Sequence, residues 1–329
     1  MTSTGSTALE RQIRSQPEAI EHMLSSPSVR EQVRRAGEGL HRARRLWLIG
    51  TGTSLHAAEI GVAMLMEAGR AATAVPAMQF VTRAPVIGPK DGVIIITHTG
   101  ETSYALAARA LAFTGGLDTV TITKRGSDFP RVIETVEPEP SETYTASYTT
   151  AVVALALIAR ELGAEQFSDD VMRVIPAAVQ DAIDDAGVGS VPRPERVLTI
   201  AGAGPAATTA REGALKVREA ARVLAEGYDV EYLLHGSAVP LDGRDHLVSL
   251  TPPDEALVAG VGAAAMQEGL GVTTLREPST LPALLAQVPL TVRLQLLALR
   301  LAREGGHDPD RVIVGAWGDD ALWRVGAPE

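Results

Sequence analysis

The chain has 329 residues, of which 45% are hydrophobic, and it carries a formal net charge of −10 at pH 7 and no cysteine. This length allows two ordinary domains with a sizeable core. No apolar run approaches the ~18 residues that a membrane-spanning helix requires, the first residues do not resemble a secretory signal, and disulfides and thiolate metal sites are excluded. Because an acidic chain repels phosphate backbones, we do not expect it to bind nucleic acid. Since neither a signal nor a spanning segment is seen, we expect a cytoplasmic protein that binds no membrane.

Residues Leu9–Arg44 have the pattern of amphipathic helix, and from about residue 45 onward β-branched apolar runs alternate with Ala- and Leu-rich helical stretches. This alternation is typical of parallel sheets covered by helices, so the predicted fold class is α/β. The first half is predicted to contain strands at Arg45–Thr51, Ala72–Pro76, Gly92–Thr97 and Asp118–Thr123, and a long helix at Ser147–Leu162.

The second half repeats this order of elements, which predicts an internal duplication. Its predicted elements are strands at Arg196–Ala201 and Leu247–Thr251 and helices at Thr208–Val223, Glu255–Glu268 and Val292–Glu304. The segment Asp169–Pro194 contains the expected boundary. We therefore expect a helical segment over 1–44, a first module over 45–170, a second module over 190–305, and a tail over 306–329 to which no structure is assigned.

Two predicted strands of the first module each end in a turn rich in glycine and hydroxyl side chains. One strand runs into Thr51-Gly52-Thr53-Ser54 and another into Thr97-His98-Thr99-Gly100-Glu101-Thr102-Ser103, and a helix follows each turn. The carboxyl ends of parallel strands meet at one edge of the sheet, where N–H groups at helix starts stabilise anions. The alternative is that these residues only cap helices, but two such turns together favour a phosphate site.

A second candidate site consists of Glu212, Lys216 and Glu219, which share one helix face because they are spaced i, i+4 and i+7. A glutamate whose pKa is tuned by its neighbours can move a proton between adjacent sugar carbons. On a bare helix the same pattern is more often a solvated row of salt bridges. The turns of the second module that correspond to the phosphate turns, residues 202–206 and 251–254, contain prolines that lack N–H donors, so we expect one phosphate site per chain.

The motifs GTGTS, THTGETSYAL and EGALKVREAARVLAEGY, the last followed by HG, resemble the isomerase half of glucosamine-6-phosphate synthase and its double-SIS (sugar isomerase) relatives. The resemblance covers nearly the whole chain, including the opening QIRSQPEAI. It implies two tandem SIS modules, each a three-layer αβα arrangement of helices around a parallel sheet. It also implies a homodimer that binds a phosphosugar in a shared active site and needs no metal or organic cofactor.

The resemblance assigns roles to individual residues. Ser54, Thr97, Thr99 and Thr102 would bind the sugar phosphate, with backbone help from Gly52, Thr53 and His98. Glu219 would be the proton-transfer base, Glu212 and Lys216 would support it, and His235 would be the ring-opening acid or base, supplied across the dimer interface.

Two features depart from the family pattern. Family enzymes that isomerise amino-sugar phosphates place a lysine in the tail, whereas here the family-like lead-in DPDR at 308–311 is followed by none. Arg324 could replace its charge but not its proton exchange, because a guanidinium stays protonated. In the loop before the long helix, Tyr144 and Ala146 stand where the synthase has serine and lysine. No glutamine-hydrolysing domain or N-terminal cysteine precedes the modules, so a complete synthase is not expected.

The leading hypothesis is an aldose–ketose isomerase or isomerising deaminase acting on an amino-sugar phosphate such as glucosamine 6-phosphate. A fructosamine-6-phosphate deglycase is the second hypothesis, favoured by the altered tail. A non-catalytic phosphosugar sensor is the third, although a pure binder has no need of a base such as Glu219 or of His235. No histidine pair has the spacing of metal ligands on a helix, so no metal is expected.

Overall fold

The computed structural model describes residues 6–83, 85–253, 255–319 and 321, which form two compact units. The N-terminal unit consists of Glu18–Glu139 and Ala146–Arg173, with the described part of the tail from Ile313. The C-terminal unit consists of Pro140–Thr145 and Val174–Val312, with the described start of the chain up to Pro17. No helix among the described residues is long and apolar enough to cross a membrane.

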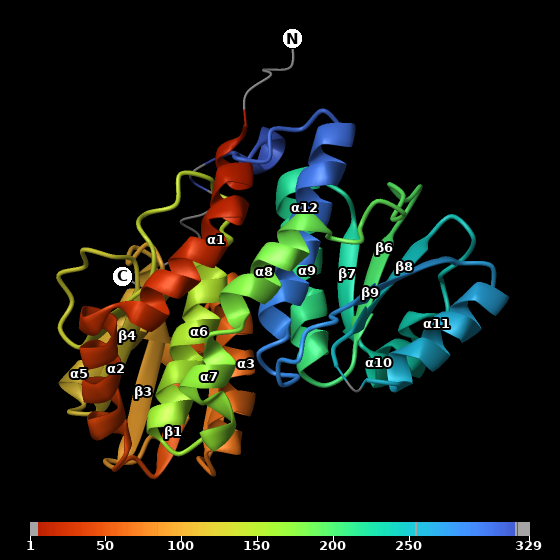
Figure 1. Ribbon diagram of the computed structural model, residues 1–329. Helices are drawn as coiled ribbons and strands as arrows, with labels where there is room; N and C mark the ends of the chain where they lie inside the picture. The colour runs from red at the N-terminus through yellow and green to blue at the C-terminus, as the bar shows by residue number, and fades with distance from the viewer. Residues whose placement is uncertain (1–5, 84, 254, 320, 322–329) are drawn as a thin grey trace. The chain divides into compact units, whose positions relative to one another are not determined.

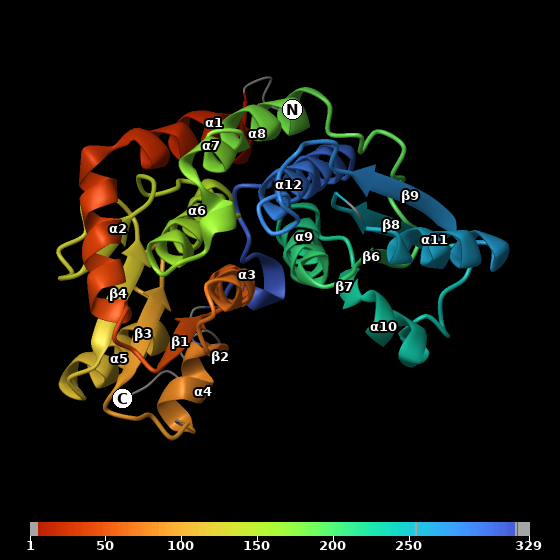
Figure 2. The same ribbon diagram turned by 60° about the horizontal axis from the view of Figure 1, so that its bottom comes forward.

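The N-terminal unit contains a five-stranded parallel sheet in the order β2-β1-β3-β4-β5, of which Figure 1 labels β1, β3 and β4. Helices cover both faces, with α4 and α5 on one and α2, α3 and α6 on the other (Figure 2). The strands are β1 (Arg45–Gly50), β2 (Ala72–Pro76), β3 (Asp91–Ile96), β4 (Asp118–Thr123) and β5 (Val132–Glu134). The helices are α2 (Pro27–Leu40), α3 (Thr53–Glu67), α4 (Ala77–Thr82), α5 (Ser103–Thr114), α6 (Ala146–Glu161) and α7 (Asp169–Met172), with short 3₁₀ turns at Glu165–Phe167 and Gly315–Trp317.

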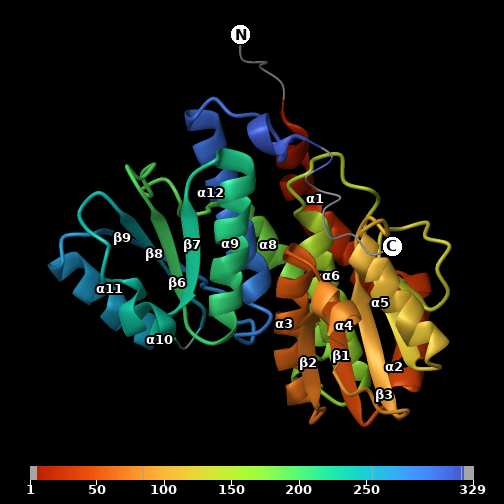
Figure 3. The same cartoon turned by 180° about the vertical axis from the view of Figure 1, so that it is seen from behind.

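The C-terminal unit contains a four-stranded parallel sheet in the corresponding order β7-β6-β8-β9 (Figure 3). Helix α9 packs on β6 and β7 and against α12, while α11 packs on β8 and β9. The strands are β6 (Leu198–Gly202), β7 (Ala225–Asp229), β8 (His246–Thr251) and β9 (Gly271–Arg276). The helices are α8 (Ile175–Asp184), α9 (Pro205–Ala221), α10 (Val230–Tyr232), the kinked turn Leu233–Ser237, α11 (Leu257–Gln267) and α12 (Gln287–Glu304).

The predicted helical segment at the start of the chain forms two helices, α1 (Ala8–Ser25) and α2. The break falls at Ser26, whose hydroxyl accepts the Val29 N–H at 3.4 Å, and Pro27 occupies the first helical position, where its missing N–H has no consequence. The start of α1 is held by Asp310 of the DPDR segment, whose carboxylate accepts the N–H groups of Ala8 and Leu9 at 2.8 and 2.7 Å.

The amino ends of β1 and β3 are joined by a buried carboxylate. Asp91, which is 5% exposed, accepts hydrogen bonds from the Arg45 guanidinium at 2.8 Å and from the Gly88 N–H at 3.0 Å. Arg45 also donates to the Val86 carbonyl, five residues before Asp91, at 2.7 Å. Side-chain donors and this N–H lower the pKa of Asp91 although burial raises it. The carboxylate therefore fixes the strand starts of the first sheet.

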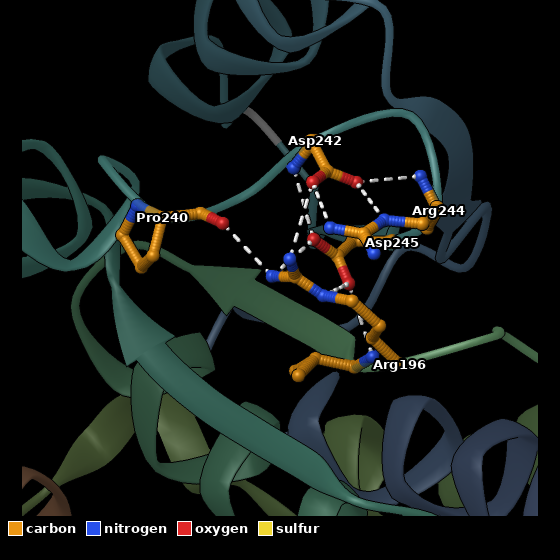
Figure 4. Close-up of polar contacts among 6 residues, drawn as sticks. Arg196, Pro240, Asp242, Arg244 and Asp245 are labelled. Atoms are coloured by element: carbon orange, nitrogen blue, oxygen red, sulfur yellow. Dashed lines mark hydrogen bonds and ion pairs between the residues drawn. The ribbon is translucent and has the colours of Figure 1, made fainter.

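The same arrangement recurs at the amino ends of β6 and β8 (Figure 4). Asp245 accepts from Arg196 Nε at 3.2 Å and from the N–H of Asp242, three residues earlier, at 2.9 Å. Arg196 also donates to the carbonyl of Pro240, five residues before Asp245, at 2.8 Å. An arginine, an aspartate and two backbone groups at matching offsets thus occupy the same place in both sheets, which supports the predicted duplication.

Candidate functional site

The turn between β1 and α3 is built around two glycines. Gly52, the residue before the helix, has φ 55° and ψ −127°, a conformation that suits glycine because it has no Cβ. At Gly50 a Cβ would lie 2.5 Å from the backbone of Ser54, which is too close for any side chain. The Ser54 N–H then bonds to the Thr51 carbonyl at 3.1 Å, so the helix starts at once. Its first N–H groups lie at the carboxyl end of β1, where they can stabilise an anion.

The turn between β3 and α5 contains the three predicted threonines. Thr97 is 3% exposed and extends the ladder, because its N–H donates to the Ile122 carbonyl at 3.0 Å. Its hydroxyl has no hydrogen-bond partner among the described residues, which costs free energy unless a ligand or water supplies one. The Thr99 hydroxyl accepts the Glu101 N–H at 3.2 Å. Thr102 precedes α5, yet its side chain makes no capping hydrogen bond. Helix capping therefore does not account for Thr97 and Thr102.

His98 lies between these threonines and is braced by its neighbours. Its carbonyl accepts the Lys124 N–H at 3.1 Å, and its Nε2 accepts the Glu139 N–H at 3.4 Å. The Glu139 carboxylate accepts the N–H groups of Ala146 and Ser147 at 3.1 and 2.8 Å and so caps α6. Burial lowers the pKa of His98, which Glu139 opposes and Lys124 reinforces. A ring nitrogen that accepts a hydrogen bond is unprotonated, so His98 braces the turn and brings no charge to it.

A His98→Gln variant should lose the pH dependence of stability that this histidine causes. The pKa of His98 is lower in the folded protein than the ~6.5 of an unfolded chain. The stability that the folded protein gains from the neutral histidine is therefore present above pH ~6.5, and it is lost as the pH falls below that value. Between pH 7 and pH 5 the melting temperature of the wild type should fall more than that of His98→Gln. Parallel melting curves for the two proteins would contradict this, and the exposed His22→Gln serves as control.

The corresponding turn of the C-terminal unit has the same backbone conformation but fewer N–H donors. Gly204 has φ 54° and ψ −125°, almost the values of Gly52, but Pro205 occupies the first position of α9 and has no N–H. Thr251, six residues after Asp245, is 3% exposed, and its hydroxyl also lacks a partner among the described residues. Asp254 lies outside the described residues. One phosphate site per chain stays a prediction.

Glu212, Lys216 and Glu219 lie on one face of α9, as their spacing predicts. Lys216 Nζ is 2.6 Å from Glu219 Oε2 and 3.5 Å from Glu212 Oε1. The side chains of Lys216 and Glu212 are 1% and 0% exposed, whereas Glu219 is 20% exposed. The solvated row of salt bridges, considered as the alternative, is therefore wrong. Burying an ion pair costs free energy, because both charges lose their hydration. Here the buried pair of Lys216 and Glu212 places the lysine beside the partly exposed carboxylate of Glu219.

His235 lies on the kinked turn that follows α10. The turn is shaped by Gly236, whose φ is 110°, and α10 begins at the side-chain cap of Asp229, which accepts the Glu231 N–H at 2.8 Å. The His235 ring is exposed and makes no hydrogen bond or ion pair with the residues that the structure describes. Its predicted role across a dimer interface stays a prediction.

The predicted site residues form two groups, one in each unit. The N-terminal unit holds the phosphate-binding candidates on two turns after neighbouring strands, Gly52, Thr53, Ser54, Thr97, His98, Thr99 and Thr102. The C-terminal unit holds the acid–base candidates, Glu212, Lys216, Glu219 and His235. Tyr144 is half-buried, Ala146 is the first residue of α6, and Arg324 lies outside the described residues.

Sequence reasoning missed Glu139, which joins the His98 turn to α6. A capping residue normally directly precedes its helix, but Glu139 is seven residues before Ala146, so no local pattern indicates this role. Within the described ranges, no group of three or more His, Asp or Glu side chains could hold a metal ion.

Residues 39–159 match the model of the SIS domain, a range that includes both turns of the N-terminal unit. The isomerizing glutamine–fructose-6-phosphate aminotransferase of Pyrococcus horikoshii is 29% identical over 336 residues, which cover 92% of this chain and 55% of that protein. The chain thus spans just over half the length of this curated relative.

Two solved structures have the same fold. The tagatose-6-phosphate ketose/aldose isomerase of Escherichia coli is 21% identical with a TM-score of 0.77, over 96% of this chain and all of that one. The glucosamine-6-phosphate deaminase of Thermotoga maritima is 17% identical with a TM-score of 0.75, over 92% of this chain and 97% of that one.

Proposed function

We propose that this chain, which carries an SIS domain at residues 39–159, is an aldose–ketose isomerase or isomerising deaminase that acts on an amino-sugar phosphate such as glucosamine 6-phosphate. The relatives and solved structures that it resembles include an isomerizing aminotransferase, a ketose/aldose isomerase and a deaminase of phosphosugars. The observation that carries the proposal is the pair of turns after β1 and β3. Each turn combines glycine, hydroxyl side chains and the N-terminus of a helix, and the proposal assigns no cationic side chain to the phosphate.

In this proposal the phosphate is held by hydroxyls and backbone N–H groups. The hydroxyls are those of Ser54, Thr97, Thr99 and Thr102, and the N–H groups are those of Gly52, Thr53 and His98. The unpaired hydroxyl of buried Thr97 supports the assignment, because a phosphate oxygen would accept its hydrogen bond. Since the chain has a net charge of −10, the affinity must come from these local donors.

The chemical step is assigned to the C-terminal unit. Glu219 takes a proton from one sugar carbon and returns it to the next, and Lys216 orients this carboxylate. His235 assists ring opening from the other subunit of a homodimer, and Glu212 completes the buried charge cluster. The short contact between Lys216 and Glu219, with only Glu219 reaching solvent, supports this division of roles.

A fructosamine-6-phosphate deglycase is the second candidate. It would carry out the same proton transfer and then cleave a C–N bond in a glycated amine. The altered tail favours it, because no lysine follows the DPDR segment at 308–311. Tyr144 and Ala146, beside the start of α6, are a second departure from the synthase. Release of free amine from a fructosamine 6-phosphate would support this candidate.

Thr99→Val and Ser54→Ala should each bind glucosamine 6-phosphate about tenfold or more weakly than the wild type. A hydrogen bond to a charged group contributes about 1.5–3 kcal/mol, and each variant removes one hydroxyl. Isothermal titration calorimetry measures the change. Thr114→Val, which alters an exposed threonine at the other end of α5, should bind as the wild type does. Unchanged affinity in both site variants would show that the phosphate binds elsewhere.

A further inference from the structure

Lys124 follows the carboxyl end of β4, the strand that pairs with β3 beside the turn between β3 and α5. Its N–H donates to the His98 carbonyl at 3.1 Å, and its Nζ is 3.7 Å from Oε1 of Glu101. His98 and Glu101 both belong to this turn, so both ends of Lys124 contact it. Of the other two lysines in the chain, Lys90 precedes β3 at its amino end and Lys216 belongs to the C-terminal unit.

The ion pair between Lys124 and Glu101 is weak. The Glu101 side chain is 80% exposed and that of Lys124 is 28% exposed, and pairs that involve such exposed groups contribute little because water screens the charges. The separation of 3.7 Å is also longer than that of a hydrogen-bonded ion pair. A phosphate ester, which carries a charge of about −1.5 to −2 at pH 7, can therefore replace Glu101 beside the ammonium group.

The backbone that carries Lys124 is held on both sides. The Thr123 hydroxyl donates to the His98 carbonyl at 3.3 Å, and the Arg125 N–H donates to the Val136 carbonyl at 2.9 Å. Because these bonds and the Lys124 N–H fix the backbone beside the turn, only the lysine side chain has to move when it changes partner.

The positive charge of Lys124 acts on the turn. Burial is the main reason that the pKa of His98 is lowered, and the Lys124 charge lowers it further because a second positive charge beside it is unfavourable. The same positive potential attracts an anion that binds at the turn. The next cation along the chain, Arg125, is paired with Glu137 at 3.2 Å.

We propose that Lys124 is a further phosphate-binding residue, whose ammonium group leaves Glu101 for the sugar phosphate and makes the site prefer a phosphate to a singly charged sulfate. This inference rests on the proposed function, because it takes the phosphate to bind at the two turns. It adds one positive charge to the hydroxyls and N–H groups proposed there. Such neutral donors suit either anion, whereas attraction to an ammonium group is about twice as strong for two negative charges as for one.

The test compares glucosamine 6-phosphate with glucosamine 6-sulfate by calorimetry on the full chain. The wild type should bind the phosphate more tightly. Lys124→Met should weaken phosphate binding about tenfold and sulfate binding only about threefold, so that the preference shrinks. Lys124→Arg keeps the charge and should keep most of the preference. Lys90→Met removes the same charge from an exposed lysine at the amino end of β3 and should leave both affinities unchanged.

Glu101→Gln should have the opposite effect and strengthen phosphate binding about threefold. The variant removes the carboxylate that competes for the ammonium group, and an exposed pair of this kind is worth little more than that factor. A purely structural role of the ion pair predicts weaker binding in this variant, as it does in Lys124→Met. The two variants together therefore separate a ligand contact from a structural one.

Unchanged phosphate affinity in Lys124→Met would overturn the proposal, and so would an equal loss for phosphate and sulfate. Weaker phosphate binding by Glu101→Gln would also contradict it. Should Lys124→Met not fold, Lys124→Arg and Glu101→Gln decide, because loss of the preference in the first or no gain in the second refutes the exchange of partners. Failure of this inference alone leaves the losses in Ser54→Ala and Thr99→Val intact, whereas failure of the proposed phosphate site removes those losses as well.

Discussion

Replacing Glu219 by glutamine should lower turnover of the sugar phosphate by at least about a hundredfold and leave its binding unchanged. General acid–base catalysis is typically worth about 10²–10⁴-fold, and glutamine keeps the shape of the side chain while removing the base. Lys216 can still donate to the amide oxygen, so α9 should keep its structure. Binding should persist because the proposed phosphate contacts belong to the N-terminal unit. Product formation and calorimetry measure the two effects separately.

The control for this variant is Glu268→Gln, an exposed glutamate after α11, which should be fully active. Mixing inactive Glu219→Gln with inactive His235→Ala should restore part of the activity if the two residues come from different subunits that exchange. A monomer in sedimentation experiments would contradict the shared site, and near-normal turnover by Glu219→Gln would show that the base is elsewhere.

Replacing Lys216 by methionine should destabilise the protein by about 3–5 kcal/mol. Removing one partner of a buried ion pair takes a compensating charge away from the other, which is costly for Glu212 because its side chain is 0% exposed. Urea unfolding should show a lower midpoint with a similar slope. Arg218→Met, an exposed basic residue on the same helix, should change stability by less than about 0.5 kcal/mol.

A compensating variant keeps this test decisive even if Lys216→Met does not fold. Replacing a buried pair by apolar residues is often neutral, so Lys216→Met combined with Glu212→Leu should regain much of the lost stability. Its turnover should stay low, because Glu219 loses the ammonium group that orients it. An unfolding midpoint of Lys216→Met equal to that of the wild type would refute the buried charge cluster.

The central strands could be predicted from the sequence and most edge strands could not. Almost every residue of β1, β3 and β4 is buried, so their sequences are largely unbroken runs of apolar or β-branched residues. The missed strands β5, β7 and β9 lie at sheet edges and are half-exposed, which removes that pattern. In β7 the sequence AEGYD has little strand propensity, and pairing with β6 determines its conformation.

Two helices that have a proline in the first turn start earlier than predicted. α12 begins at Gln287 rather than Val292, with Pro289 in its first turn, and α9 begins at Pro205 rather than Thr208. Proline is tolerated there because the N–H groups of the first turn have no partner within the helix.

The candidate site was predictable only where its chemistry is local. The turn motifs and the i, i+4, i+7 spacing identify hydroxyls and charges that lie close in sequence. The burial of Lys216, the neutral state of His98 and the role of Glu139 depend on packing between distant segments. These features arise from the tertiary structure, so no sequence pattern could predict them.

The most direct test is to incubate the protein in D₂O with a panel of hexose and aminohexose phosphates and to follow isomer formation, ammonia release and loss of carbon-bound hydrogen by NMR. We expect at least one aminohexose phosphate to be converted, with solvent deuterium entering at the carbon that exchanges its proton. We also expect Glu219→Gln to abolish both the conversion and the exchange. If wild-type protein binds several of these phosphates but converts and exchanges none, the chain is a phosphosugar sensor, and the proposed isomerase or deaminase activity is wrong.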